Sequence, residues 1–125
     1  NNIKPDGHHF IADDVLEFLP RLIRRKEQFD MIILDPPTFS RGNKGKRFRV
    51  EEDMPTLVNY ALELATPKAR ILISTNCTRL NTAELERIAR SSLKAVRKSG
   101  TFHHSPDLPD FPPNTTASTL WLHLT

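Results

Sequence analysis

The stretch FDMIILDPPTF, residues 29–39, decides the fold that the sequence predicts. Residues 29–34 form an apolar run without the alternation of a half-buried strand, which is typical of a parallel strand covered by helices on both faces. The run ends abruptly at Asp35, Pro36 and Pro37. In open α/β sheets ligands bind outside the carboxyl ends of the strands, so we expect this corner to face a ligand.

The elements on either side of this strand alternate between extended and helical patterns. We expect strands at residues 8–12, 29–34, 70–75, 101–104 and 118–124, helices at 15–28, 50–64 and 82–96, and loops at 38–49 and 106–113. Such alternation predicts a mostly parallel sheet with helices on both faces, and the last two strands predict an antiparallel edge. The chain has 125 residues, which fits one small domain, residues 1–125.

Composition narrows the class of protein. The single cysteine, Cys77, excludes an internal disulfide and a multi-cysteine zinc site, and the five histidines have no partners at ligand spacing, so we expect no metal site. The sequence has no apolar run of membrane-spanning length and no signal peptide at its first residues, so we expect a soluble, cytoplasmic protein without a membrane partner.

The corner after the first expected strand carries Asp13 and Asp14. A carboxylate here can accept a hydrogen bond from the exocyclic amine of an adenine. The same residues can instead cap the amino end of the following helix, where an acidic side chain is favourable. The residues alone leave both interpretations open.

The corner after the second strand combines Asp35 and Pro36 with Phe39. Successive prolines fix the backbone and remove N–H donors, which leaves carbonyl acceptors beside a carboxylate and an aromatic ring. Such a rigid corner suits a planar base that bears an amino group. The alternative is an ordinary turn at the end of a strand.

The corner after residues 70–75 holds Cys77. A thiolate can add to carbon 6 of a cytosine and thereby activate carbon 5, which is nucleophilic catalysis. A lone cysteine is also a common inert core residue, so the pattern alone allows both.

A basic cluster follows the Asp-Pro-Pro corner. It is made of Arg41, Lys44, Lys46, Arg47 and Arg49. The net charge is only +3, so the grouping of these cations matters more than their number. They suit contacts with the phosphates of a nucleic acid, and a solvated loop would explain them equally well.

Residues 29–40 resemble the fourth motif of class I methyltransferases that modify bases. More narrowly, the chain is similar to the bacterial large-subunit ribosomal RNA methyltransferases that include a 23S rRNA 5-methylcytosine enzyme and a 7-methylguanine domain. Residues 12–16 resemble the family's third motif, which implies that Asp14 contacts the adenine of the cofactor. Residues 74–80 fall where the 5-methylcytosine branch carries its cysteine nucleophile, although Asn76 and Arg79 replace the small residues of that branch.

The resemblance implies S-adenosylmethionine as cofactor, RNA as substrate, in particular ribosomal RNA, and cytosine carbon 5 as a candidate target. It implies the strand order 3-2-1-4-5-7-6 with strands 3 to 7 present, so we expect a partial catalytic domain that lacks the glycine-rich cofactor loop and is inactive alone. Two other functions remain open: an RNA-binding module without chemistry, and an exocyclic-amine methyltransferase acting on DNA or protein.

The expected absence of strands 1 and 2 has a consequence for residues 29–34. A strand with an open edge tends to recruit a partner. We therefore expect either residues 8–12 to pair with this strand or a second copy of the chain to do so.

Overall fold

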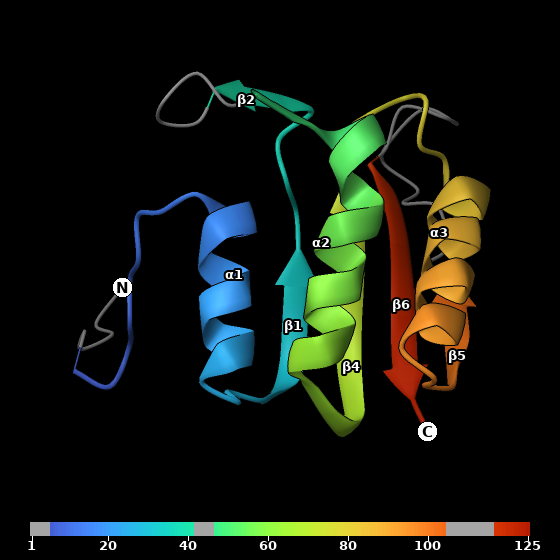
Figure 1. Cartoon of the computed structure of the whole chain (residues 1–125). Helices are drawn as coiled ribbons and strands as arrows, with labels where there is room; N and C mark the ends of the chain where they lie inside the picture. Colours follow the sequence, from blue (N-terminus) through green and yellow to red (C-terminus); the bar gives the residue numbers. More distant parts are fainter. Residues whose placement is uncertain (1–5, 42–46, 105–116) are drawn as a thin grey trace.

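The computed structural model describes residues 6–41, 47–104 and 117–125. The elements, in chain order, are α1 (Val15–Arg24), β1 (Phe29–Leu34), β2 (Phe39–Arg41), β3 (Arg47–Arg49), α2 (Val50–Leu64), β4 (Ala65–Thr75), α3 (Thr82–Ala95), β5 (Gly100–His104) and β6 (Ser118–Leu124). Figure 1 shows the helices beside a single main sheet, with the small β2–β3 pair above it.

The main sheet has the order β1-β4-β6-β5. β1 is parallel to β4, whereas β6 is antiparallel to both β4 and β5. Three strands therefore run in one direction, which confirms the α/β class and the expected order 4-5-7-6. The last two strands form the expected antiparallel edge, because β5 at the end of the sheet pairs antiparallel with β6.

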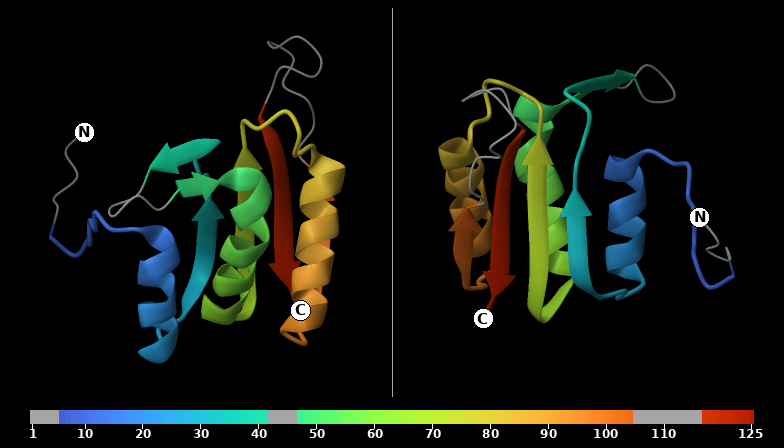
Figure 2. Two further views of the ribbon diagram at one scale, coloured as in Figure 1. Left: turned by 45° about the horizontal axis from the view of Figure 1, so that its top comes forward. Right: turned by 180° about the vertical axis from the view of Figure 1, so that it is seen from behind.

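The helices do not cover both faces as expected. Figures 1 and 2 show α2 and α3 on the same face of the sheet and α1 beside β1, while the view from behind shows strands without helices in front of them. Met31 and Ile33 on this bare face are 52% and 61% exposed. The crossovers through α2 and α3 both step along the sheet in the same sense, and their common handedness places both helices on one side.

Residues 8–12 do not form a strand. They are exposed, Phe10 by 86% and Ile11 by 57%, and they pair with no part of the sheet. A strand needs a neighbour that completes its backbone hydrogen bonds. In the described part of the chain β1 pairs only with β4, so the expectation that residues 8–12 would close its open edge is wrong.

Residues 38–49 are not simply a loop. β2 and β3 form an antiparallel ribbon in which Phe39 pairs with Arg49 and Arg41 with Arg47. The middle pair is Ser40 and Phe48, and Phe48 is buried. The alternation in Arg47-Phe48-Arg49 sends the aromatic ring to the core and the two arginines to solvent, as a strand requires.

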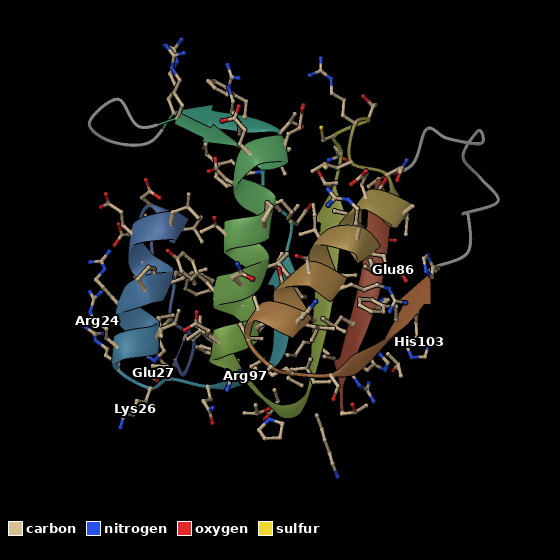
Figure 3. The ribbon with its side chains drawn as sticks, turned by 45° about the vertical axis from the view of Figure 1, so that its right-hand side comes forward. Arg24, Lys26, Glu27, Glu86, Arg97 and His103 are labelled. Atoms are coloured by element: carbon tan, nitrogen blue, oxygen red, sulfur yellow. The ribbon has the colours of Figure 1, made fainter. Side chains whose placement is uncertain are left out.

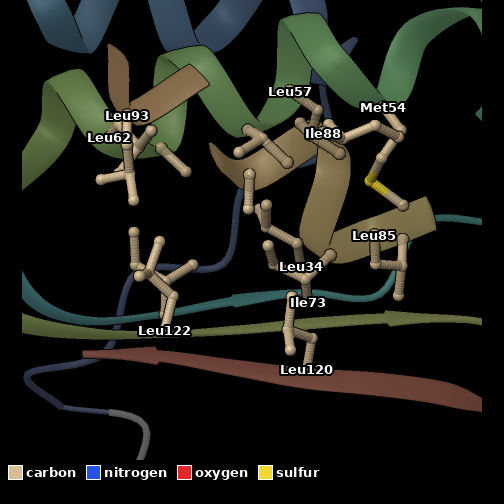
Figure 4. Packing of buried hydrophobic residues seen from close by; sticks show 14 of the residues in the cluster. Leu34, Met54, Leu57, Leu62, Ile73, Leu85, Ile88, Leu93, Leu120 and Leu122 are labelled. Atoms are coloured by element: carbon tan, nitrogen blue, oxygen red, sulfur yellow. The ribbon is translucent and has the colours of Figure 1, made fainter. Parts of the chain in front are cut away.

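The core lies between the sheet and its one layer of helices (Figure 4). Met54 and Leu62 of α2 and Leu85 of α3 pack toward Ile73 of β4 and Leu122 of β6, and all of these are buried. This apolar layer holds the carboxyl ends of β1 and β4 in place, which is where the expected site residues lie.

The helix bounds follow local signals. α2 begins and ends where the apolar spacing predicts, although Pro55 lies in its second turn rather than its first. Asn81 caps α3 by accepting a hydrogen bond from the Glu84 N–H at 2.9 Å. α1 continues through Pro20 and ends at Arg24, shorter than expected.

Candidate active-site cleft

An open cleft of about 780 Å³ lies at the carboxyl end of β1. Its walls come from the start of α1, the end of β1 with the Asp-Pro-Pro corner, the β2–β3 ribbon and Leu57 of α2. The structure therefore brings together residues from three separate stretches of sequence that were expected to face a ligand.

Asp35 and Pro36 line this cleft directly after β1. Leu34 is buried and anchors the corner, whereas Asp35 is exposed and Pro36 is half-buried. Pro36 and Pro37 have no N–H, so the backbone here presents carbonyl acceptors only. Asp35 adds a carboxylate at the same place, which makes the corner rich in acceptors, as the sequence predicts.

Asp13 and Asp14, at the start of α1, also line the cleft. Asp14 is the N-cap of α1, because its Oδ1 accepts from the Leu16 N–H at 3.0 Å. Asp13 Oδ1 accepts from the Asp14 N–H at 2.8 Å, and its Oδ2 pairs with Arg21. Both oxygens of Asp13 are thus engaged, while in the described part of the chain Asp14 uses only one. Asp14 is the aspartate that can still accept a bond from a ligand.

Phe39 does not line this cleft, although the sequence placed it with Asp35 and Pro36. It lies on β2 opposite Arg49, and it is 48% exposed. The aromatic residue that does line the cleft is Phe48, which sequence reasoning missed. The only sequence signal for a buried Phe48 was its position between two arginines, which is the alternation of a short strand.

Cys77 is buried and stands apart from the cleft lining. Its Sγ lies 3.7 Å from Oε1 of Glu51 in the first turn of α2, and its N–H donates to Thr75 Oγ1 at 3.1 Å. Arg79 pairs with the same Glu51 carboxylate at 3.4 Å. The thiol therefore contacts a carboxylate that the sequence analysis did not single out, because 26 positions separate the two residues.

The basic cluster divides into two parts. Arg41 and Arg47 line the rim of the cleft, whereas Arg49 is held by α2. Arg49 Nη1 pairs with Glu52 at 3.2 Å, and its backbone N–H donates to Asp53 at 2.7 Å. The other two expected members, Lys44 and Lys46, lie outside the described residues.

Two of the five histidines, His103 and His123, form a separate feature on the bare face of the sheet. The rings of His103 and His123 are in contact, with centroids 4.4 Å apart and their planes tilted by 39°. Desolvation lowers the pKa of His123, and the neighbouring charges of His103 and Arg70 lower it further. In residues 6–41, 47–104 and 117–125 no three histidine, cysteine or acidic side chains are grouped as metal ligands would be.

Similarity to solved structures defines the class of protein. The fold matches a SAM-dependent methyltransferase from Agrobacterium tumefaciens with a TM-score of 0.65 and 21% identity, covering 91% of this chain and 38% of that one. It matches SMU.776 complexed with SAH with a TM-score of 0.69 and 20% identity, covering 91% of this chain and 30% of that one. The chain thus has the class I methyltransferase fold.

Sequence similarity narrows this class to a particular group of homologues. The chain is 34% identical over 84 residues to the ribosomal RNA large subunit methyltransferase K/L of Psychrobacter cryohalolentis, covering 66% of this chain and 10% of the relative. It is 32% identical over 111 residues to the K/L methyltransferase of Chromohalobacter salexigens, and the match covers 86% of this chain and 15% of that relative. No family model matches the chain.

The chain therefore spans about a tenth to a seventh of the length of these K/L relatives. Among the described residues, no helix has the length and apolar character needed to cross a membrane.

Proposed function

We propose that this chain is the substrate side of an S-adenosylmethionine-dependent methyltransferase that modifies a base in RNA, in particular ribosomal RNA, in the cytoplasm. The observation that carries this proposal is the composition of the cleft. Its lining combines the carboxylate of Asp14, the Asp-Pro-Pro corner and the basic side chains of Arg41 and Arg47. The K/L relatives support RNA as the substrate.

The described residues fit the adenosine end of the cofactor. Apolar side chains, among them Val15, Leu16 and Ile33, line the cleft beside Asp14. An adenine needs an apolar slot for its ring and an acceptor for its amine, and the second oxygen of Asp14 can be that acceptor. When bound, S-adenosylmethionine supplies an electrophilic methyl group.

The corner at Asp35 and Pro36 is proposed to hold the target base. Its carboxylate and carbonyls accept hydrogen bonds from the amino group of a cytosine, adenine or guanine, and the rigid prolines fix their directions. This positioning places one edge of the base against the protein and leaves the reactive atom directed into the cleft.

Cys77 is the proposed nucleophile if the target is cytosine. Its thiolate would bond to carbon 6, and carbon 5 would then take the methyl group, with S-adenosylhomocysteine as the leaving group. Removal of the carbon 5 proton by a base would break the carbon 6–sulfur bond and release the thiolate. The contact with Glu51 places a proton acceptor 3.7 Å from the thiol. Cys77 lies outside the cleft lining, so this chemistry requires the base to extend past the Asp-Pro-Pro corner toward β4.

A second candidate is methylation of an amino group or ring nitrogen without a covalent adduct. The position of Cys77, buried against Glu51 and away from the cleft, favours this alternative. In this chemistry Asp35 and Pro36 accept from the amine and no thiol takes part.

Transfer of radiolabelled methyl groups to ribosomal RNA by the full-length protein tests the proposal. We expect Asp35→Asn to lower turnover about 100-fold or more, because the corner positions the base. Cys77→Ala separates the two candidates: complete loss of turnover supports cytosine carbon 5, and retained turnover removes the thiol from the reaction. Protein that binds RNA but leaves it unmethylated in the presence of cofactor would favour a binding module and contradict the proposed activity.

A further inference from the structure

The outward face of the β2–β3 ribbon combines an aromatic ring with arginines. The register places Phe39, Arg41, Arg47 and Arg49 on one face, because paired residues share a face and neighbours along a strand alternate. All four are exposed, whereas Ser40 and Phe48 on the other face are half-buried and buried. The ribbon thus has one side that belongs to the core and one that is open to a partner.

Arg41 and Arg47 are direct neighbours across the ribbon. Like charges in this position destabilise a ribbon unless an anion lies between them. In the described part of the chain neither guanidinium has a carboxylate partner, whereas other arginines, such as Arg21, Arg87 and Arg90, do. An anionic ligand would remove this repulsion.

Arg49 has a different role on the same face. Its guanidinium pairs with Glu52 and its backbone N–H donates to Asp53, so this arginine already has a carboxylate partner and the ribbon is linked to the first turn of α2. The Val50 N–H adds a bond to the Thr38 carbonyl at 3.2 Å. The two arginines without a carboxylate partner among the described residues, Arg41 and Arg47, therefore form one end of this face, and Phe39 lies at the other end, opposite Arg49.

We propose that this face binds single-stranded RNA beside the target nucleotide, with a phosphate between Arg41 and Arg47 and an unpaired base stacked on Phe39. Arginine and aromatic side chains on one strand-built surface are the combination that single-stranded nucleic acids require. Arg41 and Arg47 also line the rim of the cleft, so the bound strand would pass its mouth. The inference rests on RNA being the substrate. It assigns Phe39 to a base that flanks the target nucleotide, not to the target base itself.

The test is the affinity of the protein for a 12-nucleotide unstructured RNA that carries 2-aminopurine, measured by fluorescence over a range of salt concentrations. R41Q/R47Q should flatten the dependence of log affinity on log salt by about 0.7, because the two arginines share one phosphate and each phosphate contact on a single strand contributes about 0.7. R24Q/R97Q removes the same charge at the opposite end of the molecule (Figure 3) and should leave the slope unchanged.

Phe39→Leu keeps an apolar side chain without the aromatic ring. We expect it to weaken single-strand binding about tenfold and to abolish quenching of the 2-aminopurine, because stacking on an aromatic ring contributes at that scale. Phe10→Leu, which changes a ring outside the ribbon that is 86% exposed, against 48% for Phe39, should have no effect. A duplex of the same sequence should bind the native protein more weakly and should not respond to Phe39→Leu.

Three results would overturn the inference: no RNA binding by the native protein, equal salt slopes for the two double variants, or unchanged quenching in Phe39→Leu. Circular dichroism checks that each variant is folded. Since none of these measurements uses the cofactor, binding that depends on the ribbon would stand even if no methyl transfer were found.

Discussion

Asp14 has two roles that a single substitution would confuse. Its Oδ1 caps α1, and its other oxygen is the proposed acceptor for the adenine amine. Asp14→Ala should lower the free energy of unfolding by about 1 kcal/mol, whereas Asp14→Ser restores most of the cap with a side chain too short for the ligand. Urea unfolding measures the first effect.

Calorimetric titration of the full-length protein with S-adenosylmethionine measures the second effect of these two variants. Both Asp14→Ala and Asp14→Ser should weaken cofactor binding. If Asp14→Ser binds the cofactor as the native protein does, Asp14 is a cap alone.

His123 makes the stability of the sheet depend on pH. Its pKa is lowered in the folded state, first by desolvation and then by the charges of His103 and Arg70. The unfolded chain therefore binds this proton more readily, so stability is complete above the ordinary pKa of 6.5 and falls as the pH drops through the folded pKa. His103→Gln should raise the pKa of His123, as followed by NMR titration of the ring. His104→Gln, which removes a ring that contacts Glu86, is the matched control and should leave the titration unchanged.

At the scale of elements, the end of α2 depends on a distant lysine. Lys98 Nζ donates to the carbonyls of Leu62 and Ala65 at 2.6 and 2.8 Å, although desolvation lowers its pKa. Lys98→Met should lower the free energy of unfolding by about 1–3 kcal/mol, because two carbonyls lose a charged donor. Lys94→Met on the exposed side of α3 should change it little. Equal urea midpoints for the two variants would contradict this role.

The elements that sequence predicts well are those whose signals are local. The spacing of apolar residues gives α2 its bounds, and the Asn81 cap marks the start of α3. The prediction of a strand at residues 8–12 was wrong, because an extended sequence pattern does not provide the neighbouring strand that it would have to pair with. The β2–β3 ribbon was missed because charge and glycine hid a short alternating pattern around Phe48.

In the candidate site, too, features with local sequence signals could be predicted and features set by packing could not. Asp14, Asp35 and Pro36 could be predicted because each follows a strand or precedes a helix, and such corners meet at one edge of the sheet. The contact between Cys77 and Glu51 and the outward position of Phe39 depend on how α2 and the ribbon pack. No spacing along the chain encodes those arrangements.

For the molecule as a whole, the open edge of β1 adjoins the bare face at Met31 and Ile33. We propose that isolated chains associate through this edge, because an apolar edge strand recruits a partner. Sedimentation should show concentration-dependent association that Ile33→Lys abolishes. Thr101→Lys on the polar edge strand β5 is the matched control and should leave association unchanged. A monomer at all concentrations would contradict the proposal.

The bare face of the sheet also determines how the chain should respond to heat. Because the core lies on one side of the sheet only, unfolding exposes less apolar surface than it does in a sheet covered on both faces. The heat-capacity change of unfolding increases with the apolar surface exposed. For 125 residues the usual value is about 1.5–1.9 kcal/mol/K, and this chain alone should fall below it. Its stability curve would then be shallow and broad. Any partner that covers Met31 and Ile33 should raise the heat-capacity change and make the stability curve steeper. The heat-capacity change measured by calorimetry therefore reports whether the second face of the sheet is covered.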